Sequence, residues 1–176
     1  MKLKKIFIIL TAMITLGTAT VYAVNSTHTV DAKVNKATFP KKMRGNWYHY
    51  SDYSKKVNKQ VITKKHFKIN DGGYKYTRYL HVNPTGQAHD YYNGNKKKLN
   101  WIFITSNVRA HGRTWLATRG WYESAGAGAF LNVSKLNGHK VLTWAGGAGV
   151  WGSEHWYCSR KLAKRLRNQR YTGFKY

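Results

Sequence analysis

The sequence predicts an all-β protein, an antiparallel meander of about eight or nine strands that closes into a small barrel and is followed by a C-terminal helix. Two observations carry this prediction. Between residues 43 and 157, apolar and polar residues alternate in short segments with the period of two that is typical of strands. Turn signals rich in Gly, Asn and Asp separate these segments. We expect the sheet to close because closure removes the exposed edges of an open sheet.

The first half of the pattern contains three strands. The first is expected at 43–50, and a long alternating segment follows at 61–69. Asp71-Gly72-Gly73 is a strong turn signal between that segment and the next strand, 74–82. Asn83-Pro84-Thr85-Gly86 predicts another turn. Short turns of this kind predict antiparallel neighbours.

The second half of the pattern continues in the same way. Further strands are expected at 88–92, 99–105, 114–123, 129–134, 140–144 and 150–158. Asn137-Gly138, between the fourth and fifth of these, is the clearest two-residue hairpin signal in the chain.

One helix is expected after the last strand. Ser159 can cap it, and Leu162, Ala163 and Leu166 share one face. Arginines and lysines take the other faces, so the helix is basic. Residues 171–176 are compatible with a final short strand.

The N-terminal residues are typical of a secretory signal peptide, expected at 1–23. Lys2, Lys4 and Lys5 precede an apolar run at 6–16, and Val21-Tyr22-Ala23 gives the small-x-small pattern of a cleavage site. An uncleaved N-terminal anchor is the alternative. We expect a flexible lead-in at 24–39, then one domain at 40–176 that holds the barrel and the basic helix.

Positive charge is the strongest functional signal. The chain has 31 Lys and Arg against six Asp and Glu, a formal charge of +25. Without the three lysines of residues 1–23, 28 basic residues remain against six acids, a charge of +22. Solubility of a small domain needs a net charge of roughly 2–8. The excess therefore favours a polyanionic partner outside the cytoplasm.

The expected function is non-enzymatic binding of the anionic cell envelope, or of other extracellular polyanions, by a secreted protein that charge retains at the envelope. Expected partners are anionic cell-wall polymers or a membrane surface. Nucleic acid is a possible partner too. Its binding would be non-specific, because no RNA-recognition or helix-turn-helix signature is present. No cofactor is expected. The residues expected to contact the polyanion are Lys64, Lys65, Lys96, Lys97, Lys98, Lys161, Lys164 and Arg165.

Aromatic residues supply the core material. The chain has seven Trp, thirteen Tyr and six Phe, and we expect Trp47, Trp121 and Trp151 in the core or lining the barrel. Cys158 is the single cysteine, so the chain has no internal disulfide and stability must come from packing. We expect Cys158 to be a small buried hydrophobe near the end of a strand.

Catalytic motifs are sparse, and no catalytic residue is predicted. Glu123 and Glu154 are the best candidates for a carboxylate pair, which would make the protein a cell-wall hydrolase. The alternative is that both acids neutralise neighbouring Arg or Lys. The histidines show no His-Glu-x-x-His spacing, and Glu154 and His155 should face opposite sides of a strand, so no metal site is predicted.

Two resemblances add to this picture. Arg44-Gly45-Asn46-Trp47-Tyr48 after a signal peptide, with Gly149-Val150-Trp151 and the basic C-terminal helix, resembles a group of small exported, poorly characterised proteins of lactic-acid bacteria. That resemblance implies location more than activity.

Gly45 and Trp47 are also similar to the Gly-x-Trp of lipocalin-like (calycin) barrels. In that family a basic residue after the last strand packs over the Trp, and Arg160 is the matching residue here. The second acidic motif and the disulfide of that family are absent. The resemblance implies the alternative function, a barrel that binds a small apolar ligand.

Overall fold

The computed structural model describes residues 29–30, 38–83, 85 and 94–176. Its elements are β1 (Thr29–Val30), η1 (Lys41–Met43), β2 (Gly45–Ser51), β3 (Lys56–Ile62), β4 (His66–Asp71), β5 (Tyr74–Leu80), η2 (Lys96–Asn100), β6 (Trp101–Ala110), β7 (Arg113–Gly120), β8 (Ala129–Leu136), β9 (His139–Gly146), β10 (Trp151–Tyr157) and α1 (Arg160–Leu166). η1 and η2 are 3-10 helices.

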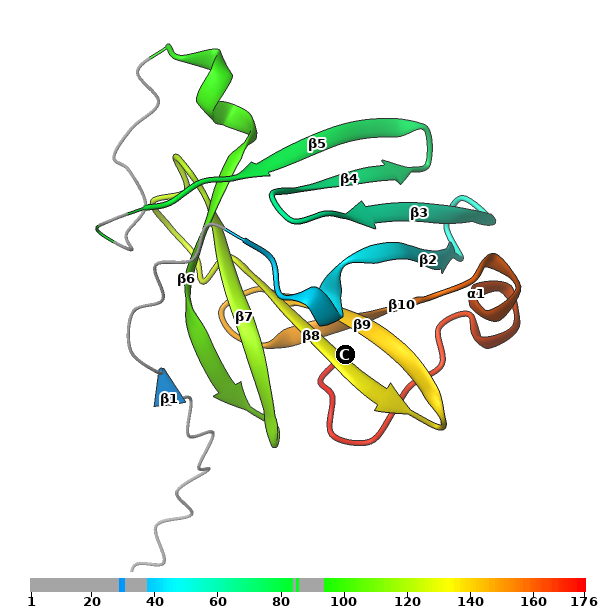
Figure 1. The fold of residues 1–176 in the computed structure, drawn as a ribbon. Helices are drawn as coiled ribbons and strands as arrows, with labels where there is room; N and C mark the ends of the chain where they lie inside the picture. Colours follow the sequence, from blue (N-terminus) through cyan, green and yellow to red (C-terminus); the bar gives the residue numbers. More distant parts are fainter. Residues whose placement is uncertain (1–28, 31–37, 84, 86–93) are drawn as a thin grey trace, which may run out of the picture.

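The strands β2 to β10 pair in chain order and β10 returns to β2, so the sheet closes into a ring (Figure 1). β1 adds outside this ring, on β6. The predicted all-β fold, a closed meander with one C-terminal helix, is therefore confirmed. One pairing departs from a simple meander, because β5 and β6 run parallel. A parallel pair needs a crossover connection, which here runs between Leu80 and Trp101.

The ring consists of two leaves. Antiparallel ladders join β2 to β5 in one leaf and β6 to β10 in the other, and the shortest of them, between β7 and β8, pairs three residues of each strand. The two seams between the leaves are short. β10 and β2 pair at Tyr157 and Tyr48, and β5 and β6 pair at Tyr79 with Trp101 and Leu80 with Ile102.

The lumen of the barrel holds one of two hydrophobic clusters. Phe67 on β4 contacts Trp144 on β9 with ring centroids 5.4 Å apart, although these strands are not neighbours in the ring, so both rings point inward. Trp47 and Leu142 belong to the same cluster and are buried. Phe39, before β2, is fully buried in this cluster, and its N–H donates to the Lys64 carbonyl at 2.9 Å.

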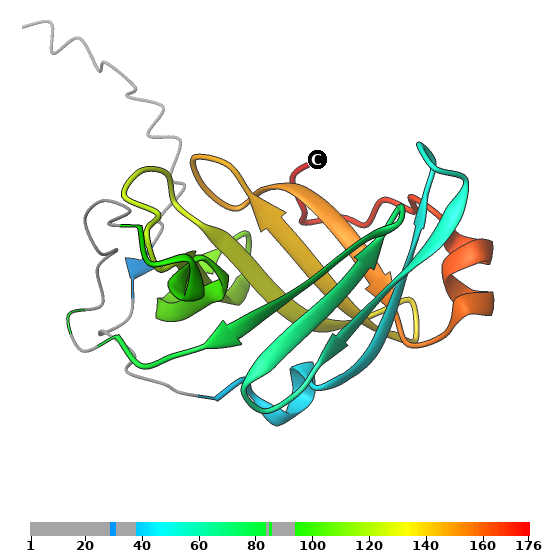
Figure 2. The same cartoon turned by 90° about the horizontal axis from the view of Figure 1, so that it is seen from above.

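The second cluster, here called the tail cluster, lies on the outside of the β6–β10 leaf. The opposite faces of the same strands supply Trp115 and Tyr157, and the C-terminal region supplies Ala163, Tyr171 and Phe174. Figures 1 and 2 show the C-terminal segment, in red, returning from α1 along the outside of the barrel. The segment 171–176 covers the sheet with side chains and is not the short strand that the sequence allowed.

Local sequence signals account for several element ends. Asn137 and Gly138 both have positive φ, +45° and +81°, as the predicted turn between β8 and β9 requires. The Ser159 hydroxyl accepts from the Leu162 N–H at 3.2 Å and caps α1. The first strand begins at Gly45 because residues 41–43 form η1 instead.

Several expectations fail or fall outside the described residues. Cys158 and Trp151 are exposed, not buried, because both lie where β10 meets a loop. The strand expected at 88–92 lies outside the described residues, as do the signal segment and most of the lead-in. Among the described residues, no helix combines the length and apolar character needed to cross a bilayer.

Candidate functional site

The cations predicted to contact a polyanion lie in three places. Lys64 and Lys65 occupy the turn between β3 and β4, the run 96–98 forms most of η2, and Lys161, Lys164 and Arg165 lie on α1. All are exposed except Lys98, which is half-buried. Figures 1 and 2 place η2 and α1 on opposite sides of the barrel, so the set does not form a single patch.

Two of the three groups meet at an aromatic cluster. His81 stacks on Trp101 with centroids 3.7 Å apart, and Trp101 meets Trp121 edge-on at 5.0 Å. The Lys98 ammonium lies 5.6 Å and 5.8 Å from the centroids of the two Trp rings. Burial, and then the charge of Lys65, lower the pKa of His81. The structure thus brings Lys65 and Lys98 to one aromatic surface.

The carboxylates of Asp52 and Asp71 are bound to amide side chains. Asn168 donates to Asp52, and Asn58 donates to Asp71. These two acids therefore accept from amide donors and not from Lys or Arg.

Glu123 and Glu154 also have partners other than Lys and Arg. Glu123 accepts from the Gly120 N–H at 2.8 Å. Glu154 accepts from the Trp156 indole N–H at 2.6 Å and lies 3.5 Å from the His49 Nε2. Within the described part of the chain, no Lys or Arg forms an ion pair with a carboxylate. Neither Glu123 nor Glu154 therefore forms an ion pair with a neighbouring Arg or Lys among the described residues.

Aromatic rings are the partners of many cations instead. Arg160 lies over Tyr48 at 5.4 Å, Arg167 over Tyr50 at 5.1 Å and Lys140 over Trp47 at 5.2 Å, each measured to the ring centroid. A ring face attracts a cation without cancelling its charge. The net field of the molecule consequently stays strongly positive.

The Gly-x-Trp segment has the expected place at the start of the first long strand, but its cation differs. Gly45 has φ +132°, a conformation that favours glycine, and the Trp47 indole N–H donates to the Met43 carbonyl at 2.8 Å. Lys140 covers Trp47, where Arg160 was expected. Arg160 contacts the neighbouring Tyr48, whose side chain points to the opposite face of β2.

A cavity of about 460 Å³ opens from the lumen beside the loop between β7 and β8. Phe67, Tyr76, Trp121 and Trp144 form its aromatic wall, and Arg78 adds a guanidinium. Trp121 borders this cavity at the end of β7, but its ring packs edge-on against Trp101 and Phe103, whose positions alternate with the inward residues Ile102 and Ile104, so it is not placed in the lumen as expected.

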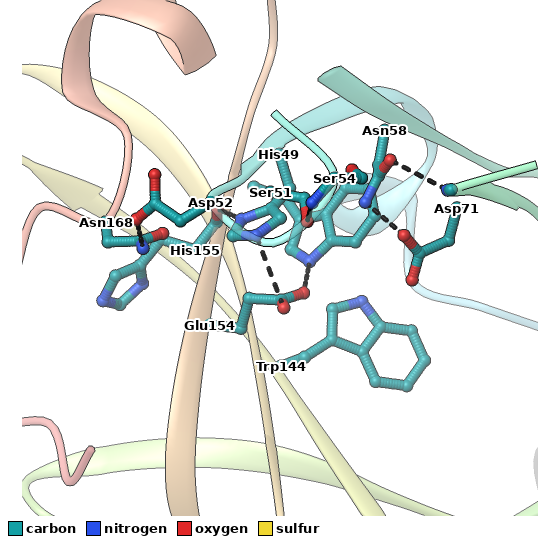
Figure 3. A network of polar contacts seen from close by, with 12 residues as sticks. His49, Ser51, Asp52, Ser54, Asn58, Asp71, Trp144, Glu154, His155 and Asn168 are labelled. Carbon is teal, nitrogen blue, oxygen red and sulfur yellow. Dashed lines mark hydrogen bonds and ion pairs between the residues drawn. The ribbon is translucent and has the colours of Figure 1, made fainter. Parts of the chain in front are cut away.

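A second pocket of about 460 Å³ lies where β2 and β10 meet the C-terminal segment. Figure 3 shows the polar network beside it, with Glu154 pointing toward His49 and Trp144 close by. Glu154 lines this pocket whereas Glu123 lines the lumen cavity, so the predicted carboxylate pair is divided between two hollows. Among the residues whose placement is known, no three His, Cys, Asp or Glu side chains converge as metal ligands would.

His155 is a buried group whose role the sequence did not reveal. It faces outward from β10, where Nδ1 lies 2.9 Å from the Thr143 hydroxyl and Nε2 lies 2.8 Å from the Tyr176 hydroxyl. The rings of Tyr171 and Phe174 meet it edge-on at 4.9 Å. Burial is the main cause that lowers the pKa of His155 to about 4. His155 thus anchors the C-terminal segment as a neutral imidazole.

The outer face of β3, β4 and β5 carries a further cationic surface that the sequence analysis missed. Lys59, Lys68 and Lys75 line a shallow groove of about 310 Å³ there. Each of these lysines is isolated in the sequence, whereas the predicted contact residues come from segments rich in Lys and Arg. Strand alternation is the signal that could have found them.

Comparison of the chain with protein-family models, curated proteins and solved structures finds no match. The resemblances to exported proteins of lactic-acid bacteria and to calycin barrels therefore stay predictions.

Proposed function

We propose that the protein is a secreted, non-enzymatic, strongly cationic barrel that binds the anionic cell envelope or other extracellular polyanions. The observation that carries this proposal is the lack of internal neutralisation. In the described residues, carboxylates bind amides, a backbone N–H, an indole and a histidine, and none binds Lys or Arg. The charge is left free to act on a partner.

Physical chemistry links this charge to polyanions. A polymer with closely spaced negative charges holds condensed counterions, and lysines or arginines that replace them release those ions. The affinity therefore depends steeply on salt. Anionic wall polymers are the first such partner that an exported protein would meet.

The test is retention of residues 24–176 on purified Gram-positive cell walls. Retention is expected at about 50 mM salt, with progressive release as the salt rises, because counterion release weakens with ionic strength. Retention that is unchanged up to molar salt would contradict electrostatic binding.

A second candidate function, binding of a small apolar ligand, is favoured by the lumen cavity. Its volume of about 460 Å³ lies within the roughly 300–1,000 Å³ typical of ligand sites, and its wall is aromatic. Native mass spectrometry of protein purified from an exporting host is expected to reveal a co-purified ligand. Replacement of Ala129, which lines the cavity, by Phe should abolish that mass shift. Ligand-free spectra together with failure of an apolar fluorescent probe to bind would rule this candidate out.

A further inference from the structure

Strand register gathers three lysines on the outward face of the β2–β5 leaf. Trp47, Gln60, Ile69 and Tyr76 are register partners on the inward face, as the burial of Trp47 in the lumen shows. The alternate residues therefore point outward, in two adjacent cross-strand rows. The first row is Lys59, Asn70 and Lys75, and the second is Val61, Lys68 and Thr77.

The three lysines form a triangle across the groove. Lys68 is the diagonal neighbour of both Lys59 and Lys75, a relation that separates Cα atoms by about 7–8 Å. Lys59 and Lys75 lie two strands apart in the same row, at about 9–10 Å. Lys68 and Lys75 are exposed, and Lys59 is half-buried.

Among the described residues of β3, β4 and β5, no acid offsets these charges on the outward face. Asp71, at the end of β4, belongs to the opposite face and accepts from Asn58. The three like charges repel one another across these diagonal and two-strand separations. An anion in the groove would remove that repulsion, so the arrangement is complementary to a negatively charged ligand.

The chemistry of the groove suits phosphate groups and offers its ligand no stacking surface for bases. All three cations are lysines, which bind phosphate as point charges and impose no planar geometry on it. The outward residues between them are Val61, Asn70 and Thr77, which offer no ring for base stacking. Tyr76 also borders the groove, but its side chain belongs to the inward face, where the Arg78 guanidinium lies 5.5 Å from its ring centroid.

We propose that the groove of Lys59, Lys68 and Lys75 is a binding site for a linear phosphodiester polymer without bases, such as a polyol-phosphate chain. The three ammonium groups contact successive phosphates, and the Asn70 amide and the Thr77 hydroxyl face the free hydroxyls of the polyol units. This inference rests on the proposed function and names the polymer class that it prefers.

The test compares two variants that lose the same charge. One carries Lys59→Gln, Lys68→Gln and Lys75→Gln, and the control carries Lys41→Gln, Lys135→Gln and Lys175→Gln, three exposed lysines outside the groove. Binding to a glycerol-phosphate decamer is measured by fluorescence anisotropy from about 50 to 200 mM salt. The probes for comparison are a uronate decamer and a thymidine decamer.

The groove variant is expected to lose about tenfold more affinity for the glycerol-phosphate decamer than the control. Its slope of log affinity against log salt should fall by about 2, since each single-strand phosphate contact contributes about 0.7. The single substitution Lys68→Gln should lower the affinity for the glycerol-phosphate decamer more than Lys135→Gln does. This comparison keeps the test valid if the triple variant misfolds.

Equal losses in the two triple variants would overturn the groove while leaving the proposed function intact. A larger effect on the uronate or thymidine decamer would also overturn it, because the occupant would then be a carboxylate polymer or a nucleic acid. If the unaltered protein binds none of the three decamers at low salt, the proposed function itself fails.

Discussion

At the scale of single residues, neutral and aromatic groups replace the ion pairs of an ordinary surface. With four carboxylates in the described part and many more cations, ring faces become the common neighbours of arginine and lysine. His155 is likewise kept uncharged by its surroundings. It sits among Tyr171, Phe174 and Tyr176, where a second positive charge would be both desolvated and close to Arg113.

His155 should therefore make stability depend on pH. Its pKa is about 4 in the folded protein and about 6.5 when unfolded, so the unfolded chain binds the proton more readily between these values. The free energy of unfolding, measured with urea, is expected to decline from about pH 6.5 to pH 4, by up to about 3 kcal/mol from this group. His155→Gln should be less stable at pH 7 but show a smaller decline. An equal decline in the variant would contradict this role.

At the scale of elements, the loop between β7 and β8 holds one wall of the lumen cavity through Gly128. Gly128 has φ +76°, and a Cβ there would lie 2.2 Å from the Thr118 carbonyl oxygen. Backbone atoms cannot yield as a side chain can, so glycine is required for this close approach. Gly126 also has positive φ, +80°, but a Cβ there would meet only Glu123 at 3.9 Å. The loop therefore packs closely against β7 at Gly128, whereas Gly126 has space for a side chain around its Cα.

Most elements were predictable because their signals are local. Period-two alternation, Asn137-Gly138 and the Ser159 cap all act over a few residues. The parallel pairing of β5 with β6 depends on a crossover, which no local pattern specifies. The exposure of Cys158 and Trp151 depends on where β10 ends against the rest of the barrel.

The candidate site divides in the same way. The cation-rich runs were visible in the sequence, whereas the groove of Lys59, Lys68 and Lys75 exists only once the strands are in register. Likewise, the cation over Trp47 comes from β9, a strand distant in sequence, and not from the residue that follows β10. Strand register is a long-range property, so sequence patterns alone did not supply it.

At the scale of the whole molecule, the barrel is two leaves joined at two short seams. The β2–β10 seam has little backbone pairing, and a buried side chain crosses it. His49 on β2 places Nδ1 3.1 Å from the His155 carbonyl and Nε2 3.5 Å from the Glu154 carboxylate, both on β10. The groove lies on one leaf and the tail cluster on the other, so this seam connects the proposed binding face to the C-terminal segment.

Loss of the His49 side chain should open the β2–β10 seam while the hairpins within each leaf stay closed. In His49→Ala, amide hydrogen exchange in β2 and β10 is expected to accelerate by about tenfold, as the loss of a buried hydrogen bond worth about 1–2 kcal/mol would allow. Exchange in the β6–β7 hairpin should stay unchanged, because its ladder is long.

Asn58→Ala is the matched control, since Asn58 is also buried but bonds within one leaf, to Asp71 and to the Gly72 N–H. Its effect should be confined to β3, β4 and β5. Uniform acceleration across both leaves in His49→Ala would mean that the barrel unfolds as one unit, and the two-leaf description would be wrong.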